Sequence, residues 1–407
     1  MPSESGASVV RPANSVYFPA LDGLRAIAFL MVFGAHYLKL PWGWTGVDVF
    51  FVLSGFLITG ILYDTRDQVH RVRNFYVRRT LRIFPLYYGL MLLLLLSYPL
   101  FHWRWSWGWL LWPAYLGNFF RGIHPYAYRS SMELLADFQA VSRTFPAVQL
   151  FFGHFWSLCV EEQFYLIWPW VVFRVRDRKK LLSICLACVV ICPIMRLVGN
   201  HSLPQFMLDQ EALYRWTPFR VDALLLGGLV ALVRRGPSPR RLLIGARAGF
   251  AVLLSVFVLW LALKPAALPG TVADMYPAWH FTRGLLFVDL LSACLIVMAL
   301  ESGSVVYRIF SVRPLRWLGR ISYGAYVFHD IPHYLLYRLI LHYHVWDPRD
   351  AIALAGFACT LLLSWASFRW YETPFIRLKE RWTRPAPRTA GENGEEEREQ
   401  GATGAVS

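Results

Sequence analysis

The first long apolar segment carries two ionisable residues, Arg25 and His36, whose spacing places both on one helical face. At about 100° per residue the chain turns through about 1100° between them, within about 20° of three full turns, and rises about 16 Å. An imidazole can take a proton from a hydroxyl near neutral pH, and a guanidinium binds phosphate through its planar fork. The pattern predicts a bulky charged donor near Arg25 and proton transfer near His36. In the alternative, the Arg25 side chain only extends to the polar membrane interface, and His36 only caps the outer end of the helix.

A second segment contains two adjacent acids, Glu161 and Glu162. Neighbouring helical positions differ by about 100°, so in an apolar helix at least one carboxylate is expected to point into a bundle. Such a carboxylate could orient His36 or act as a base itself, whereas pairing with an arginine is the structural alternative. The predicted catalytic residues are His36, Glu161 and Glu162, and two residues that begin the same segment are expected to bind substrate, Trp156 and Ser157.

Further candidates for substrate binding are basic. Arg78, Arg79 and Arg82 share part of one helical face, where guanidinium groups could hold the phosphates of a nucleotide-type donor. The alternative is that these arginines only set the orientation of the chain in a membrane. Asp48 begins another apolar segment and is expected at the membrane level of His36, so it joins the predicted substrate site.

The later apolar segments also contain polar residues, among them Arg220, Asp222, His329 and Asp330. Polar side chains that pack inside helical bundles are common, so each of these residues, taken singly, is assigned a structural role. The six cysteines lie in or beside apolar segments and are expected to be small packing residues. No metal site is predicted.

The elements that must position these residues are membrane-spanning helices. Only 16% of the 407 residues are charged and 56% are hydrophobic, whereas a soluble domain has charged residues near a quarter of the total. The hydrophobic residues gather in blocks long enough to cross a hydrocarbon core of ~30 Å. An all-α polytopic membrane protein with about ten transmembrane helices is therefore predicted. The expected spans are 21–38, 46–63, 84–101, 155–173, 181–199, 221–233, 248–263, 281–300, 321–341 and 351–371.

Charge sets the expected orientation of these spans. The net charge of +15 sits in short basic runs between apolar blocks, which argues against a nucleic-acid partner. With the N-terminus inside, the inner segments hold 26 Lys and Arg residues and the outer ones 9, so both termini are placed in the cytoplasm. Residues 1–19 are then a cytoplasmic arm, 20–377 the transmembrane domain and 378–407 a cytoplasmic, disordered tail. The largest outer loop is 102–154, and its Trp-rich stretch 107–120 is too short to cross unaided, so it is expected to be interfacial or re-entrant.

In their order along the chain, several strings resemble the bacterial acyltransferase family 3, membrane O-acyltransferases that modify surface polysaccharides, exported oligosaccharides and some macrolides. The strings are LDGLRA at 21–26 with His36, GVDVFFVLSGFLI at 46–58, FYVRRTLRIFP at 75–85 and WSLCVEEQFY at 156–165. Weaker matches are ISYGAYVFH at 321–329 and YETP at 371–374. The resemblance extends from about residue 20 to 377.

The resemblance implies a ten-helix fold, an acyl-coenzyme A donor met from the cytoplasm, and delivery of the acyl group to an acceptor at or beyond the outer face. The Arg-then-His motif of the family falls on Arg25 and His36, and its acidic motif falls on Glu161 and Glu162. Some members carry a fused extracytoplasmic esterase-like domain. Here we expect transfer to be completed within the membrane domain or with a separate partner.

The expected function is that of a membrane O-acyltransferase in the bacterial plasma membrane. It would move an acyl group, acetyl by default, from acyl-CoA to a hydroxyl of a sugar or cell-envelope glycan, without a bound cofactor. A macrolide-like metabolite is the alternative acceptor. A transporter would also carry intramembrane charges but would move its substrate without covalent change. A non-catalytic scaffold explains neither Arg25 nor the paired acids.

Overall fold

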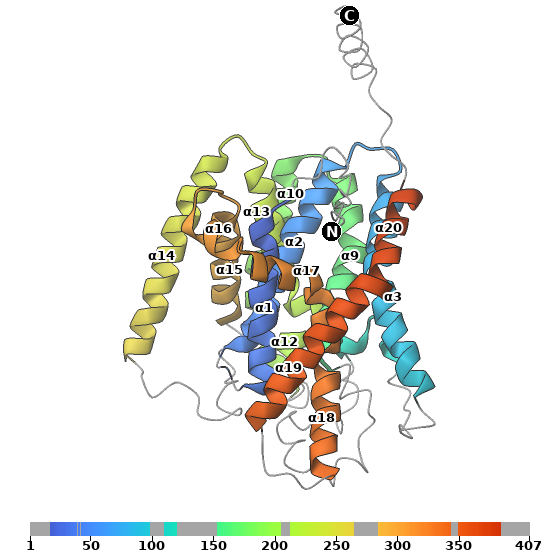
Figure 1. Cartoon of the computed structure of the whole chain (residues 1–407). Coiled ribbons are helices and arrows are strands. Elements are labelled where there is room, and N and C mark those ends of the chain that lie inside the picture. The colour runs from blue at the N-terminus through green and yellow to red at the C-terminus, as the bar shows by residue number, and fades with distance from the viewer. Residues whose placement is uncertain are drawn as a thin grey trace, which may run out of the picture.

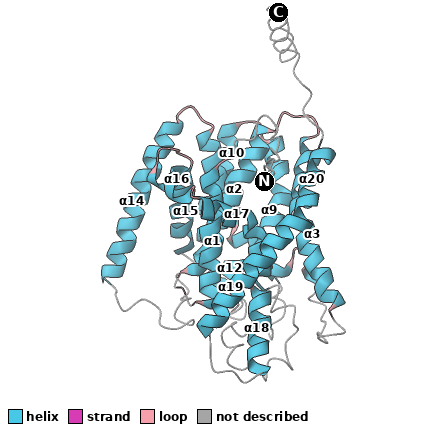
Figure 2. Ribbon diagram, viewed as in Figure 1, coloured by secondary structure: helices cyan, strands magenta, loops and turns pink. Residues whose placement is uncertain are grey.

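The computed structural model of the chain is a helical bundle (Figure 1). It describes residues 17–38, 40, 42–97, 110–119, 153–204, 212–263, 284–342 and 349–383. Figure 2 shows helices and loops, and no strand, across this described part. Five helices in it are long and apolar enough to cross a membrane: Gly43–Asp64, Arg71–Leu96, Arg178–Ser202, Pro239–Leu259 and Ala351–Trp382. The prediction of an all-α membrane protein is confirmed.

The centre of the bundle is formed by α1 (Pro19–Tyr37), α2 (Gly46–Asp64) and α13 (Val221–Arg234) (Figure 1). Helix α1 begins at a proline, whose fixed φ and missing N–H suit the first turn of a helix. Helices α2 and α13 approach closely because Gly55 and Gly227 each face the backbone of the other helix. The close crossing explains why most residues of both helices are buried.

Helix α3 (Arg71–Leu96) is longer than the predicted third span, which was expected to start at residue 84. The basic run before that point and the apolar run belong to one continuous helix, although Pro85 lies inside it. The arginines predicted to bind the donor are therefore held on a rigid helix rather than on a loop. Helix α9 (Trp156–Arg174) matches the fourth predicted span closely.

The ninth predicted span, 321–341, is two helices and not one. They are α17 (Arg313–Phe328) and α18 (Asp330–His342), with His329 between them. Pro332 explains the interruption, because it has no N–H to donate to the carbonyl group of residue 328. The break places two adjacent polar residues at a helix junction inside the bundle. The tenth span continues from α19 (Arg349–Ala366) through a π-helical turn (Ser367–Glu372) into α20 (Thr373–Trp382).

The remaining helices complete one side of the bundle. They are α10 (Arg178–Ser202), α12 (Ala212–Arg215), α14 (Pro239–Leu263), α15 (Leu285–Ala299) and α16 (Val305–Phe310). Figure 1 shows α14 standing at the edge of the molecule. Only 6% of its most apolar window is buried, so this helix presents nearly all of its surface outward.

The described part of the Trp-rich stretch is not a spanning helix. Residues 110–119 form short turns that end in a 3₁₀ turn (Gly117–Phe119). The Tyr87 hydroxyl donates a hydrogen bond to the Trp112 carbonyl at 2.8 Å, and the Gln163 amide donates to the Tyr115 carbonyl at 2.7 Å. These bonds dock the turns on α3 and α9. The remainder of the predicted outer loop, the N-terminal arm up to residue 16 and the tail from residue 384 lie outside the described residues.

Candidate active site

His36, at the end of α1, contacts a second histidine that the sequence analysis had assigned to packing. Its Nδ1 atom lies 2.9 Å from Nε2 of His329, and the two rings stack with centroids 5.0 Å apart. The His329 side chain is fully buried, whereas that of His36 is 35% exposed. His36 is thus the member of the pair that an acceptor can reach.

When both rings are neutral, the hydrogen bonds around His329 determine which nitrogen of each ring carries the proton. Nδ1 of His329 lies 2.8 Å from the carbonyl oxygen of Tyr326, which can only accept, so this nitrogen carries the proton. Nε2 of His329 is then a lone pair that accepts from the Nδ1–H group of His36. The Nε2 atom of His36 is left unprotonated. It is the atom that can take a proton from a hydroxyl group.

Asp330, the first residue of α18, supplies the carboxylate at this site. Its Oδ1 atom lies 3.6 Å from Nδ1 of His36 and accepts a hydrogen bond from the hydroxyl of Tyr37. Its Oδ2 atom lies 2.8 Å from Nδ1 of His154. A fixed negative charge beside His36 favours the imidazolium that forms when the ring takes a proton. We name His36, His154, His329 and Asp330 the histidine cluster.

The predicted partnership of His36 with Glu161 or Glu162 is replaced by one with Asp330. The Glu161 carboxylate instead accepts a hydrogen bond from the Ser54 hydroxyl of α2 and interacts electrostatically with Arg79. Oε1 of Glu162 is buried and forms no hydrogen bond within the described part of the chain. The sequence did contain a signal for Asp330. Two adjacent polar residues within an apolar segment, which drew attention to the glutamates, also occur at 329–330.

The arginines gather toward the other end of α1. Arg25 pairs with Asp22 at 3.3 Å and retains a partly exposed side chain. The Arg79 guanidinium lies 4.7 Å from the ring centroid of Tyr165, and Arg82 interacts electrostatically with both Arg25 and Arg79. Like charges that approach one another repel. Asp22 and Glu161 offset part of this repulsion, and an anionic ligand would offset more of it. We name Arg25, Arg79 and Arg82 the arginine cluster. The fourth predicted arginine, Arg78, is exposed and donates to the Thr383 hydroxyl at 3.5 Å.

One face of α9 joins the two clusters. Ser157, Glu161 and Tyr165 follow at intervals of four residues, which places them on the same side of the helix over about 12 Å. The Ser157 hydroxyl lies 2.7 Å from that of Tyr326, which donates to the carbonyl of His154. Tyr165 lies beneath Arg79 at the opposite end. These three side chains of α9, which we name the polar line, therefore extend through the bundle from the histidine cluster to the arginine cluster.

Two of the predicted substrate residues lie elsewhere. Asp48 is fully buried and forms an ion pair with Arg220, which is equally buried. A second buried pair, Arg196 with Asp222 at 2.7 Å, lies nearby on α10 and α13. These charges join the central helices to one another. Trp156 is also buried, with its ring 4.7 Å from that of Tyr214. The structure thus places Asp48 with Arg220 and Trp156 with Tyr214, in the packing of the bundle.

The histidine cluster also offers an arrangement of possible metal ligands. One donor atom each from His36, His329 and Asp330 lie within 4.8 Å of one another. In a tetrahedral zinc site with bonds of ~2.0–2.1 Å, neighbouring ligand atoms are about 3.3 Å apart. The two histidine nitrogens are 2.9 Å apart, the separation of a hydrogen bond. A direct hydrogen bond between the rings accounts for this distance better than a shared metal ion.

Comparison with known proteins identifies the family of the chain. The family model described as "Acyltransferase domain" matches residues 18–369. The chain is 32% identical to the peptidoglycan O-acetyltransferase OatA of Listeria monocytogenes, over 88% of this chain and 56% of that protein. It is 31% identical to the putative peptidoglycan O-acetyltransferase YrhL of Bacillus subtilis, over 77% of this chain and 48% of that protein. It is 28% identical to the O-acetyltransferase OatA of Staphylococcus aureus, over 89% of this chain and 58% of that protein.

The chain spans about half the length of the curated relatives that it matches. No solved structure matches it. The match to the family model covers both clusters and the helix that joins them. It confirms the predicted membership of an acyltransferase family, and the five long apolar helices support a multi-pass membrane protein. The chain belongs to the acyltransferase domain family, the membrane acyltransferases that its sequence motifs resemble.

Proposed function

We propose that this protein is a membrane O-acetyltransferase that moves an acetyl group from acetyl-CoA to a hydroxyl group of cell-envelope glycan. The observation that carries the proposal is the polar line along α9, with a proton-accepting histidine at one end and an arginine cluster at the other. The printed names of the relatives, peptidoglycan O-acetyltransferases, make peptidoglycan the first acceptor to test.

We further propose ten spans with both termini in the cytoplasm, so that the arginine cluster faces the donor and the histidine cluster faces the envelope. Two observations support this orientation. Basic residues concentrate in the segments that would lie inside. Figure 1 also shows α1, α3 and α14 beginning at the same, upper end of the bundle, where those basic segments lie.

In the proposed reaction, the phosphates of coenzyme A bind the arginine cluster and the pantetheine arm follows the polar line. Arg25 and His36 are about 16 Å apart along α1, and the arm bridges that separation. The thioester carbonyl is then beside His36. Arg78, exposed near the same end, adds positive charge for the donor.

The chemistry takes place at Nε2 of His36. This atom removes the proton of the acceptor hydroxyl while the hydroxyl oxygen attacks the thioester carbonyl carbon. The new C–O bond forms, the C–S bond breaks, and the proton is passed to the departing thiolate to give free coenzyme A. His329 holds the His36 ring in the required tautomer, and Asp330 stabilises the imidazolium.

The remaining predicted residues act by position in this proposal. Glu161 is bound to Ser54 and interacts with Arg79, so it orients the donor-binding arginine and borders the path of the arm. Ser157 holds Tyr326 against the backbone of His154. Glu162 interacts electrostatically with Tyr115 of the docked turn 110–119. Trp156 and Asp48 support the walls of the bundle.

The experiment that tests this function uses the full-length protein in proteoliposomes with labelled acetyl-CoA supplied on one side and peptidoglycan fragments on the other. Mass spectrometry of the fragments is expected to show the added acetyl group and release of free coenzyme A. Transport of intact fragments without a change of mass would identify a transporter instead. Acetylation of a macrolide, but of no glycan, would change the acceptor class.

A further inference from the structure

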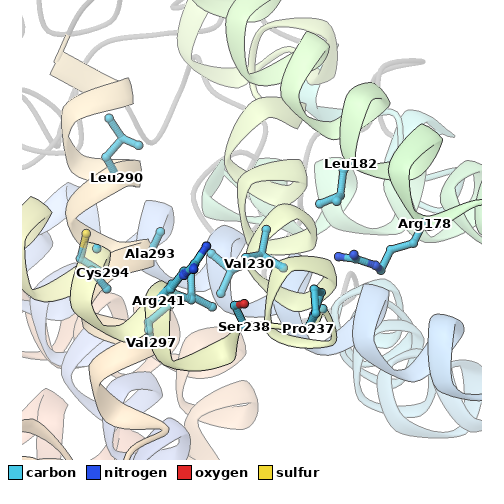
Figure 3. Close-up of a pocket in the computed structure, with 15 residues that line it drawn as sticks. Arg178, Leu182, Val230, Pro237, Ser238, Arg241, Leu290, Ala293, Cys294 and Val297 are labelled. Atoms are coloured by element: carbon cyan, nitrogen blue, oxygen red, sulfur yellow. The ribbon is translucent and has the colours of Figure 1, made fainter.

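A groove of about 580 Å³ lies between α10, α13, α14 and α15, and no residue of either cluster lines it (Figure 3). Its size falls within the ~300–1,000 Å³ of sites that bind small molecules. Helix α14 forms its outer wall and is nearly unburied on its other faces. Exposed residues on that helix include Val252 at 62% and Leu259 at 58%. In a membrane protein such a surface faces lipid, so the groove opens to the bilayer.

The lining of the groove is apolar along its length and basic at one end. Its apolar part includes Leu182, Val230, Leu242, Leu290 and Val297. The polar side chains in the lining are Arg178, Ser238 and Arg241, which lie at the start of α10 and at the start of α14. Figure 3 shows Arg178 and Arg241 on either side of Pro237 and Ser238.

These two positive charges have no acidic partner in the groove. No carboxylate lines it, and neither Arg178 nor Arg241 forms an ion pair with any carboxylate of the described chain. Arg178 donates one hydrogen bond, to the Leu232 carbonyl at 3.3 Å, and its other N–H groups have no partner among the described residues. Two guanidinium groups beside an apolar surface favour an anionic group that can accept several hydrogen bonds, such as a phosphate diester.

We propose that this groove binds an anionic phospholipid. The acyl chain lies between α10, α14 and α15, and the phosphate lies between Arg178 and Arg241. A zwitterionic lipid fits less well, because its ammonium group would come close to the two guanidinium groups and no carboxylate of the lining can balance it. Anionic lipids of the cytoplasmic leaflet attract basic residues near the membrane surface.

The proposal is independent of acetyl transfer, and native mass spectrometry of the full-length protein in detergent tests it. Phosphatidylglycerol is titrated against phosphatidylcholine of the same chain length. Phosphatidylglycerol is expected to bind at least about tenfold more tightly. The double variant R178Q/R241Q is expected to lose that preference, while R240Q is expected to keep it. Arg240 is the matched control, since it is exposed on the same turn of α14 and does not line the groove.

A second variant separates the apolar part of the site from the charges. A side chain at Gly245 would enter open space in the groove, because nothing lies within 4 Å of the position that its Cβ would take. Gly245→Phe is expected to weaken binding of both lipids with little effect on folding. Three results would overturn the proposal: equal affinity for the two lipids, displacement of phosphatidylglycerol by inorganic phosphate, or a dimer whose formation Gly245→Phe abolishes.

Discussion

The Nε2 atom of His329 lies 2.9 Å from the Nδ1 atom of His36, across a junction between α1 and α17 that joins residues 293 positions apart in the chain. Since His329 is buried and bound to the Tyr326 carbonyl, it fixes both the orientation of the His36 ring and the nitrogen that is free to accept a proton. In the proposed mechanism, the reactivity of His36 therefore depends on a buried residue that positions its ring.

Replacement of His329 tests this dependence. We expect His329→Ala to lower kcat for acetyl transfer by about 10–100-fold, by analogy with the loss of residues that orient metal-binding histidines. The KM for acetyl-CoA should stay near its original value, because the arginine cluster is untouched. His329→Gln retains an acceptor oxygen and should recover part of the loss. His201→Ala, at the exposed end of α10, serves as the control. A rise in KM with unchanged kcat would argue against a positioning role.

Asp330 should contribute to both catalysis and stability. Asp330→Ala leaves the Tyr37 hydroxyl and the Nδ1 atom of His154 without their partner, which costs about 1–3 kcal/mol per unsatisfied buried group. The melting temperature of the purified protein should fall. Asp330→Asn restores hydrogen-bonding capacity without the charge, so it should recover stability but not turnover. If Asp330→Asn turns over at the original rate, the carboxylate charge plays no part in the reaction.

The arginine cluster should determine affinity for the donor. Charge-assisted contacts to phosphate contribute about 1.5–3 kcal/mol each, so Arg82→Ala should raise the KM for acetyl-CoA by about 10–100-fold. The value of kcat should change much less. Arg73→Ala removes an exposed arginine from the first turns of the same helix and is the matched control. Equal effects of the two substitutions would show that overall positive charge, rather than this cluster, attracts the donor.

The buried pair of Asp48 and Arg220 is expected to affect folding rather than substrate binding. Removing one member of a buried ion pair costs about 3–5 kcal/mol where the other charge is left uncompensated. Asp289 and Asp222 also interact with Arg220, so the cost here is expected at the lower end of that range. Asp48→Ala should therefore lower the thermal stability of the detergent-solubilised protein and its yield in the membrane. A variant of unchanged stability with a raised KM would return Asp48 to the substrate site.

Metal removal distinguishes the two arrangements that the histidine cluster allows. Because the His36 and His329 nitrogens are at hydrogen-bonding distance, we expect prolonged dialysis against a chelator to leave turnover unchanged. Metal analysis of the active protein should find no stoichiometric zinc. Loss of turnover that added zinc restores would contradict the proton-transfer account.

Features contained within one helix could be predicted from the sequence. The eleven-residue spacing places Arg25 and His36 on α1, and the limits of α2, α9 and α13 follow from their apolar runs to within about two residues. Contacts between distant segments could not be predicted in this way. Helical periodicity says nothing of which face of α17 meets α1, so the pairing of His36 with His329 depends on tertiary packing.

Because such contacts between distant segments could not be predicted, the acidic partner of His36 could not be identified from the sequence. Glu161, Asp48 and Asp330 were all recognisable as polar residues in apolar surroundings, and each could have been the partner of His36. Their contacts with Ser54, Arg220 and His154 join different helices. The break at His329 follows from Pro332, but its consequence, a carboxylate set among three histidines, required the assembled bundle.

The central claim, that His36 performs acetyl transfer at the membrane, is tested most directly by His36→Ala in proteoliposomes with labelled acetyl-CoA and a peptidoglycan acceptor. The account predicts that the variant is folded and inserted, with labelled acetyl-CoA still bound, and that mass spectrometry finds no acetylated acceptor. Acetylated acceptor formed by His36→Ala at the rate of the unaltered protein would contradict it.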